Sequence, residues 1–333
     1  CPIYNAFVRQ FGPYQHPHTR LRRPEKDLEV LEQLGYTIIP RSGTFRDLAK
    51  ELDFIIRKLR FRILQLLPIH PVPTTFARMG RFGSPFAALD LMGVDPALAE
   101  FDPRATPLDQ FLELVDAIHS RSARVFLDIP LNHTGWASRL LARHPDWFAR
   151  NADRSFHSPE VWGVKWEDLV KLDYGRRELW TYMADMFLYW CRHGADGFRC
   201  DAGYMIPVSV WQYIVARVRD EFPDTVFLLE GLGGKPETME ELLSVANLNW
   251  AYSELFQNYD RAQISAYLPY AIRVSQDKGN LVHYAETHDN PRLAAHSHAF
   301  SRMRTALCAL ASHHGAFGIT NGVEWFADDK VDV

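Results

Sequence analysis

The sequence has few cysteines, no block of like charge and no long apolar run. Only four of the 333 residues are cysteine, without regular spacing, which argues against a disulfide framework and favours a reducing, cytoplasmic compartment. The 37 basic residues nearly balance the 41 acidic ones, so neither nucleic acid nor a membrane surface is an expected partner. No apolar run reaches the roughly 18 residues of a membrane-spanning helix. These absences favour a soluble protein.

The chain is composed as a globular protein with a sizeable core. Apolar residues make up 47% of it and charged residues 23%, which excludes disorder. The sequence opens Cys1-Pro2-Ile3 without a methionine, directly into strand-like sequence. We therefore expect it to be a piece of a longer chain with further domains.

Short runs rich in Val, Ile, Leu and Phe alternate with helical patterns along the chain. They span residues 3–8, 61–67, 123–129, 197–201, 225–230, 248–253, 281–286 and 316–320. Helix starts are predicted after Thr44 and Thr106, since each is followed three positions later by an aspartate, as in a capping box. Eight strands that alternate with helices predict an α/β fold, a (β/α)8 TIM barrel. Only residues 321–333 follow the last run, so we expect the eighth helix to be truncated.

Two connections are too long for simple turns, residues 12–43 after the first strand and 134–175 after the third. We interpret residues 134–175 as a small subdomain inserted into a catalytic barrel formed by residues 1–133 and 176–333. Aromatic residues of the insertion, with two near the sixth strand, fit either sugar stacking or a local core. They are Trp136, Trp147, Phe148, Trp162, Trp166, Trp250 and Tyr252.

Ionisable residues end four of the predicted strands. The third strand ends at Asp128 and runs into His133, and the fourth ends at Asp201. The fifth ends at Glu230, and Asp289 follows the seventh. A carboxylate at a buried strand end is costly unless it is paired, and the last three acids are predicted to converge on one mouth of the barrel. Converging acids at this place suggest glycosidic chemistry.

Read in order, these strand ends resemble the short motifs of the α-amylase family, glycoside hydrolase family 13. The matching segments are residues 83–96, 128–133, 172–174, 197–201, Glu230, 288–290 and 315–324. The resemblance spans almost the whole chain. It implies a retaining enzyme that acts on α-1,4-linked glucan or malto-oligosaccharide through a covalent glycosyl-aspartate intermediate, without a cofactor.

The resemblance also implies roles for the acids. A retaining glycosidase needs an ionised nucleophile and a protonated acid about 5–5.5 Å apart. Asp201 takes the first role, Glu230 the second, and Asp289 grips two hydroxyls of the sugar. Arg199 lies two residues before Asp201 on the same face of the strand and favours its charged form. Glu230, among carboxylates, is expected to be shifted towards its neutral form.

The remaining expected substrate contacts lie around these acids. His133 and His288 would donate hydrogen bonds to the same sugar ring. Phe86 stands where the family usually has a tyrosine that stacks on the sugar. Asp128 is placed beneath the site, where it orients Arg199.

Asn132 and Asp173 align with calcium ligands of the family. The match is partial, and calcium takes about six to eight oxygen ligands. The sequence therefore favours a site without calcium, with calcium at Asn132 and Asp173 as the alternative.

One departure from the family concerns the leaving side of the site. α-Amylases usually carry Lys-His three and four residues after the nucleophile, where this chain has Tyr204 and Met205. Tyr204 is therefore a candidate substrate-binding residue. The change is compatible with a glucanotransferase or a maltosyltransferase-like enzyme, and the residues alone do not separate transfer from hydrolysis.

Two alternatives come from other classes of protein. His16-Pro17-His18 is similar to the His-x-His pair of metal-dependent amidohydrolase barrels, but that chemistry needs a lysine and further histidines that the later strands lack. A barrel that binds glucan without catalysis is the second alternative. The presence of all three carboxylates argues against it.

Overall fold

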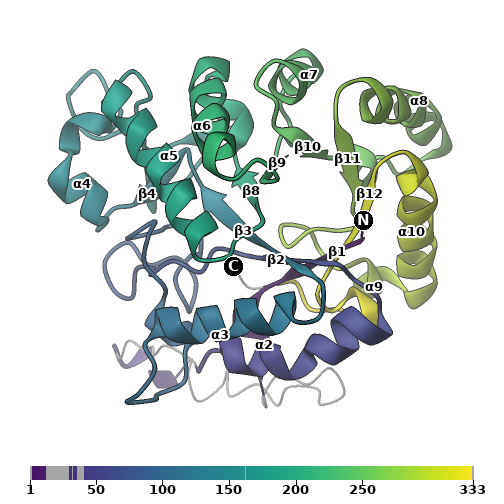
Figure 1. Ribbon diagram of the computed structural model, residues 1–333, viewed down its shortest axis with the longest axis horizontal. Helices are drawn as coiled ribbons and strands as arrows, with labels where there is room; N and C mark the ends of the chain where they lie inside the picture. Colours follow the sequence, from purple (N-terminus) through teal and green to yellow (C-terminus); the bar gives the residue numbers. More distant parts are fainter. Residues whose placement is uncertain (1, 13–29, 32, 36–40, 162, 332–333) are drawn as a thin grey trace.

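The computed structural model describes residues 2–12, 30–31, 33–35, 41–161 and 163–331. Its main sheet is a closed barrel with the strand order β1-β12-β11-β10-β9-β8-β3-β2 (Figure 1). The barrel strands are β1 (Pro2–Ala6), β2 (Ile63–Leu66), β3 (Arg124–Pro130), β8 (Gly197–Asp201), β9 (Val226–Leu229), β10 (Asn249–Tyr252), β11 (Asn280–His283) and β12 (Ala316–Thr320). All neighbouring pairs are parallel, and each strand falls within or next to a predicted run. The predicted (β/α)8 barrel is confirmed.

Helices surround the barrel on its outside (Figure 1). They are α2 (Phe45–Leu52), α3 (Pro107–His119), α5 (Arg177–Arg192), α6 (Val208–Glu221), α7 (Pro236–Ser244), α8 (Arg261–Asp277), α9 (Leu293–His296) and α10 (His298–Ala311). Across the described residues, none of the helices has the length and apolarity required to cross a bilayer.

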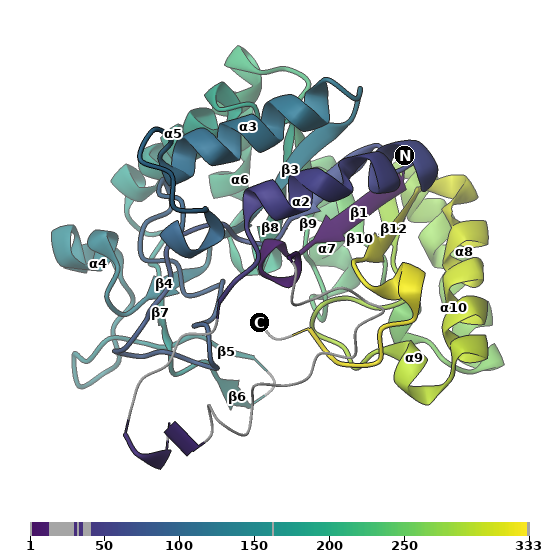
Figure 2. The same ribbon diagram turned by 90° about the horizontal axis from the view of Figure 1, so that it is seen from below.

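The segment between β3 and α5 forms its own small elements. They are β4 (His133–Gly135), α4 (Arg139–Arg143), β5 (Glu160–Val161), β6 (Val164–Lys165) and β7 (Leu169–Lys171). β4 pairs antiparallel with β7, and β5 with β6. Figure 2 shows these strands on one side of the barrel, away from α8 and α10. Buried side chains of this segment, such as Phe148 and Val170, belong to the same continuous core as the barrel and its helices.

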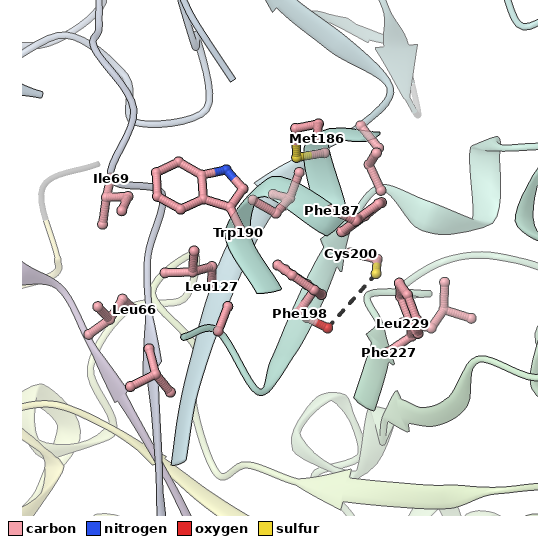
Figure 3. Packing of buried hydrophobic residues seen from close by; sticks show 14 of the residues in the cluster. Leu66, Ile69, Leu127, Met186, Phe187, Trp190, Phe198, Cys200, Phe227 and Leu229 are labelled. Carbon is pink, nitrogen blue, oxygen red and sulfur yellow. Dashed lines mark hydrogen bonds between the residues drawn. The ribbon is translucent and has the colours of Figure 1, made fainter. Parts of the chain in front are cut away.

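Helix α5 is fixed over the strands that carry the predicted site (Figure 3). The Phe187 ring packs edge-on against Phe198 of β8 and Phe227 of β9, with centroid distances of 4.7 and 5.4 Å. Trp190 is fully buried, and its indole N–H donates to the Leu91 carbonyl at 2.8 Å. This packing anchors β8 and the loop after β2 to the same helix.

Several of the aromatic residues considered for sugar stacking are core residues instead. Tyr252 is 1% exposed, and Trp250 packs on Phe126 at the start of its strand, in the barrel interior. Trp147 and Phe148 are also buried. These rings point into the core because of their positions in strands and turns. The sequence pattern alone did not show which way they point.

Other aromatic residues of the insertion have different surroundings. Trp136 is half-buried, and its indole N–H donates to the Glu167 carbonyl at 2.8 Å. Trp166 lies edge-on to the predicted site residue His133, with a centroid distance of 5.7 Å. Trp162 lies outside the described residues.

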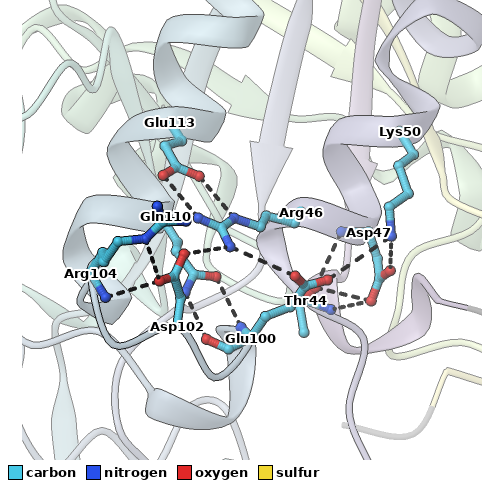
Figure 4. A network of polar contacts seen from close by, with 9 residues as sticks. All are labelled: Thr44, Arg46, Asp47, Lys50, Glu100, Asp102, Arg104, Gln110 and Glu113. Atoms are coloured by element: carbon cyan, nitrogen blue, oxygen red, sulfur yellow. Dashed lines mark hydrogen bonds and ion pairs between the residues drawn. The ribbon is translucent and has the colours of Figure 1, made fainter.

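Helices α2 and α3 begin where the capping pattern predicts. The Thr44 and Thr106 hydroxyls accept from the backbone N–H three residues on, and the aspartates there accept in return. A surface network then joins the two helices (Figure 4). Its centre is Arg46, which donates to both Glu113 carboxylate oxygens at 3.0 Å and to Asp102 at 3.1 Å.

We expect Thr44→Ala to lower the free energy of unfolding by about 1 kcal/mol, because the first turn of α2 loses its side-chain cap. Thr44→Ser keeps the hydroxyl and is the matched control. Denaturant unfolding followed by circular dichroism measures both variants. Equal midpoints for the alanine variant and the parent would show that the cap contributes nothing.

Candidate active site

The register of three adjacent strands brings the predicted catalytic residues together. Asp128 lies opposite Arg199, and Pro130 lies opposite Asp201, across the β3–β8 pair. Cys200 lies opposite Leu229 across the β8–β9 pair, so Glu230 follows directly beside Asp201. These positions are the carboxyl ends of parallel strands, the end at which such barrels carry their active sites.

Arg199 is the centre of the buried part of the site. Its Nη1 donates to Asp128 Oδ1 and Oδ2 at 2.9 and 3.0 Å and to Asp201 Oδ1 at 2.7 Å. The Asp128 side chain is 0% exposed and that of Asp201 is 14% exposed. Asp128 therefore lies below the guanidinium and cannot reach a ligand, whereas Asp201 opens to the mouth of the barrel.

A layer of polar side chains inside the barrel supports this guanidinium from below. The Tyr252 ring lies 5.4 Å from Arg199 Cζ, and its hydroxyl accepts from Gln65 Nε2 at 3.0 Å. Tyr284 donates to Gln65 Oε1 at 3.3 Å. Sequence reasoning missed Gln65 and Tyr284. The available signal was a glutamine inside the buried strand β2.

Glu230 has surroundings unlike those of Asp201. Its Oε2 accepts from the Ala202 N–H at 2.8 Å and its Oε1 from the Leu232 N–H at 3.2 Å. Ala202 has a φ of 48°, an uncommon conformation for a residue with a side chain, and this turn aims its N–H at the glutamate. Burial raises the pKa of Glu230 to about 7; the charges of Asp201 and Asp289 add to the shift, and Arg199 opposes it. The structure thus separates one ion-paired carboxylate from one carboxyl group that holds its proton near neutral pH.

The loop after β11 carries His288 and Asp289. The Asp289 side chain is 58% exposed, and its Oδ2 lies 3.4 Å from His288 Nε2. Within the described part of the chain, neither ring nitrogen of His288 forms a hydrogen bond, although the residue is 1% exposed. Burial lowers the pKa of His288, which favours the neutral ring. Its ring stacks on Phe86, with a centroid distance of 5.4 Å and an interplanar angle of 17°.

A buried ion pair closes the base of this loop. Arg292 Nη1 donates to Glu286 Oε1 at 2.9 Å, and both side chains are 2% exposed. Arg292 Nη2 also donates to the Asn321 carbonyl at 2.7 Å, and Glu286 Oε2 accepts from the Leu293 N–H at 2.8 Å. Glu286 and Arg292 therefore fix both ends of the segment that presents Asp289. Sequence reasoning included Glu286 only as a strand end and did not consider Arg292.

The other predicted side chains lie around the same mouth. His133 is buried at the start of β4, and its Nε2 lies 3.8 Å from Asp201 Oδ2. Tyr204 is half-buried in the turn after β8. Burial raises the pKa of Tyr204 to about 12, and the charges of Glu230 and Asp201 act in the same direction.

The calcium candidates do not form a complete ligand set. Asn132 is buried, whereas Asp173 is exposed and its Oδ1 accepts from the Gly175 N–H at 3.0 Å. Two side-chain oxygens fall short of the six to eight that calcium takes. Among the residues that the structure describes, no group of three or more His, Cys, Asp or Glu side chains could hold a metal ion. His16 and His18, the basis of the amidohydrolase alternative, lie outside the described residues.

Comparisons with known proteins agree on one family. Residues 41–231, more than half of the chain, match the family model "Alpha amylase, catalytic domain". The solved structure of an α-amylase from Lactobacillus plantarum superposes with a TM-score of 0.76 at 27% identity, covering 99% of this chain and 74% of that chain. A maltogenic α-amylase from Thermotoga neapolitana, at 22% identity and a TM-score of 0.73, covers 100% of this chain and 70% of its own and shares the fold.

Curated relatives carry a more specific name. An alpha-1,4-glucan:maltose-1-phosphate maltosyltransferase from Rhodospirillum rubrum is 28% identical over 314 residues, which cover 87% of this chain and 44% of the relative. An enzyme of the same name from Cereibacter sphaeroides is 29% identical over 319 residues, covering 87% of this chain and 51% of the relative. The chain thus spans about half the length of these relatives. On the barrel, the order of the strand-end residues and the match to the family model, this chain belongs to the α-amylase family.

Proposed function

We propose that the chain is the catalytic barrel of a retaining enzyme that transfers α-1,4-glucan units, with Asp201 as nucleophile and Glu230 as general acid and base. The observation that carries this proposal is the contrast between the two acids. Asp201 is ion-paired with Arg199, whereas the pKa of Glu230 is raised to about 7 by burial. A retaining mechanism requires one charged and one protonated carboxyl group side by side.

In the first step, Glu230 donates its proton to the leaving oxygen while Asp201 attacks the anomeric carbon. The bond from that carbon to the leaving oxygen breaks, and its electron pair stays on the oxygen, which takes up the Glu230 proton. In the second step, the Glu230 carboxylate accepts a proton from the attacking hydroxyl, and the new bond displaces Asp201. Two inversions at the same carbon retain its configuration.

The neighbouring side chains hold the sugar during both steps. The unpaired ring nitrogens of buried His288 are suited to a hydroxyl of the sugar, because a buried polar group without a partner is costly. Asp289 is the exposed carboxylate beside it and accepts from hydroxyl groups. Phe86, stacked on His288, presents an apolar surface to the ring. His133 lies on the other side of Asp201.

Transfer is favoured over hydrolysis by the leaving side of the site. Tyr204 stands in the turn after Asp201, where the family usually has a lysine, and faces Gly234 of the loop after Glu230. An aromatic ring there orients an acceptor sugar by contact. The curated relatives named above are maltosyltransferases, which supports the same choice. A barrel that only binds glucan would not need a carboxyl group with a pKa near 7.

We expect Asp201→Asn and Glu230→Gln each to lower kcat on malto-oligosaccharides by several orders of magnitude. On dinitrophenyl α-maltoside, whose leaving group needs no proton, Glu230→Gln should keep a rapid first step, seen as a burst of dinitrophenol, and Asp201→Asn should lose it. Asp277→Asn, an exposed aspartate at the end of α8, is the control and should retain full activity. Equal loss of the burst in both variants would overturn the two roles.

The raised pKa of Glu230 predicts the alkaline limb of the pH profile. The protonated acid is present below pH 7 and is lost as the pH rises through about 7, so kcat/KM on malto-oligosaccharides should fall there. With dinitrophenyl α-maltoside, whose leaving group needs no proton, the alkaline limb should disappear from the rate of the first step, the glycosylation of Asp201. A limb that persists unchanged in Glu230→Gln would assign it to another group.

We expect incubation with maltoheptaose to give both longer and shorter oligosaccharides with few new reducing ends. Chromatography and a reducing-sugar assay measure the two quantities. Replacing Tyr204 and Met205 together by Lys and His restores the usual amylase pair and should raise the share of hydrolysis. If the parent releases one reducing end for each bond cleaved and forms no longer product, it is a hydrolase.

A further inference from the structure

A cavity of about 470 Å³ lies between α7 and α8, beside the loop that follows Glu230. The two helices are neighbours in the outer ring (Figure 1). The volume falls within the range of about 300–1,000 Å³ that is typical of small-molecule sites. The residues that characterise this α7–α8 pocket are Met239, Glu254, Asn258, Ala266, Tyr267 and Tyr270.

The side chains of the pocket suit an uncharged ligand rich in hydroxyl groups. Tyr267 and Tyr270 provide aromatic surfaces, with ring centroids 5.8 Å apart, and Glu254 and Asn258 add polar groups. Among the described residues that line the cavity there is no lysine, arginine or histidine, which disfavours a phosphate or another anion. The Tyr270 hydroxyl is buried and has no hydrogen-bond partner among the described residues, whereas that of Tyr267 accepts from the Glu254 N–H at 2.7 Å. Apolar ring faces and hydroxyl groups together describe a sugar.

An ion pair between the two helices holds the pocket in shape. Arg273 Nη2 donates to Glu240 Oε1 at 2.7 Å and so connects α8 to α7. The Arg273 guanidinium also lies 5.3 Å from the centre of the Tyr270 ring. This contact supports the tyrosine, because a cation over an aromatic face is attracted to it.

The loop 231–234 connects this pocket to the catalytic acid. Its Leu232 N–H donates to Glu230 Oε1 at 3.2 Å, and its Gly233 N–H donates to Glu254 Oε1 at 3.0 Å. Gly231 and Gly234 line the pocket. Gly234 also faces Tyr204, since a β-carbon added to it would lie 3.3 Å from the Tyr204 β-carbon. One short loop thus contacts the pocket, Tyr204 and Glu230.

We propose that the α7–α8 pocket is a second saccharide site, which binds a neutral α-glucan oligosaccharide and transmits its occupancy to Glu230 through the loop 231–234. Glu254 is a positioning residue in this arrangement, because it holds the loop without touching the reacting atoms. The choice of α-glucan as the sugar rests on the proposed function. The preference for a neutral, hydroxyl-rich ligand rests on the pocket alone.

Binding of maltotriose to the whole protein tests the site, in the Asp201→Asn background to prevent turnover. Titration calorimetry should detect two binding events, one in the catalytic mouth and one in the pocket. Ala266→Trp places an indole in the pocket from an exposed position of α8 and should abolish one event. Ala262→Trp, one turn earlier, also exposed and not among the residues that line the pocket, is the matched control and should keep both.

An Ala266→Trp titration identical to that of Ala262→Trp would overturn the pocket proposal. A different result would overturn the proposed function instead. In that case the parent would turn over no malto-oligosaccharide, although the binding event that Ala266→Trp abolishes would still be present. The two failures are therefore distinguishable.

The pH profile tests the coupling. Glu254→Ala removes the acceptor of the Gly233 N–H and should shift the alkaline limb of kcat/KM on malto-oligosaccharides, because the loop no longer holds its position at Glu230. Glu254→Gln keeps an acceptor oxygen and should restore the parent profile. Coincident limbs for Glu254→Ala and the parent would show that the pocket is not coupled to the acid.

Discussion

The arrangement of the site depends on one buried guanidinium between two carboxylates. Arg199 is 2% exposed and would be strongly destabilising without Asp128 and Asp201, because an uncompensated buried charge is costly. Asp128 comes from β3, whereas Asp201 ends β8, the same strand as Arg199. The ion pairs therefore fix the register of these two strands at the end where substrate would bind. The same contacts keep Asp201 at the surface of the barrel mouth and Asp128 beneath it.

The neighbouring Glu230 is buried without an ion pair to Arg199, and its pKa is raised as a result. Glu230 receives two backbone N–H groups, but its carboxyl group forms no ion pair with Arg199 in the structure. Desolvation and the nearby Asp201 and Asp289 charges raise its pKa, and they outweigh those N–H donors. Asp201 is thus ion-paired with Arg199, whereas Glu230 is a buried carboxyl group whose pKa is raised. The difference between the two groups arises from the packing around them, because both are carboxyl groups.

Much of this architecture could be predicted from sequence, and the rest could not, for physical reasons. Buried parallel strands are short apolar runs, and Thr44 carries its helix-start signal locally, so strands and helix starts were predictable. The acids were predictable because a carboxylate at the end of an apolar run is unusual. The contacts of Gln65 and Arg292 were not, since their partners lie far away in the sequence or across the barrel. Tyr252 was considered for sugar stacking, yet it lies under Arg199, because strand alternation alone does not say which face of a barrel strand is the interior.

The loops that follow the strands hold parts of the site by backbone hydrogen bonds. Asp201 is fixed by ion pairs within the barrel, whereas Glu230 receives its Leu232 hydrogen bond from a loop that contains three glycines. Glycine-rich backbone is held by its hydrogen bonds rather than by side-chain packing, so the Glu254 contact to Gly233 has a large share in its position. Asp201, the proposed nucleophile, is thus held by side chains of the barrel, whereas Glu230, the proposed acid, is held by backbone groups of a loop and of the turn after β8. A raised pKa depends on the distance and solvation of each neighbour, so a movement of this loop would alter the pKa of Glu230, whereas the ion pair between Asp201 and Arg199 does not involve the loop.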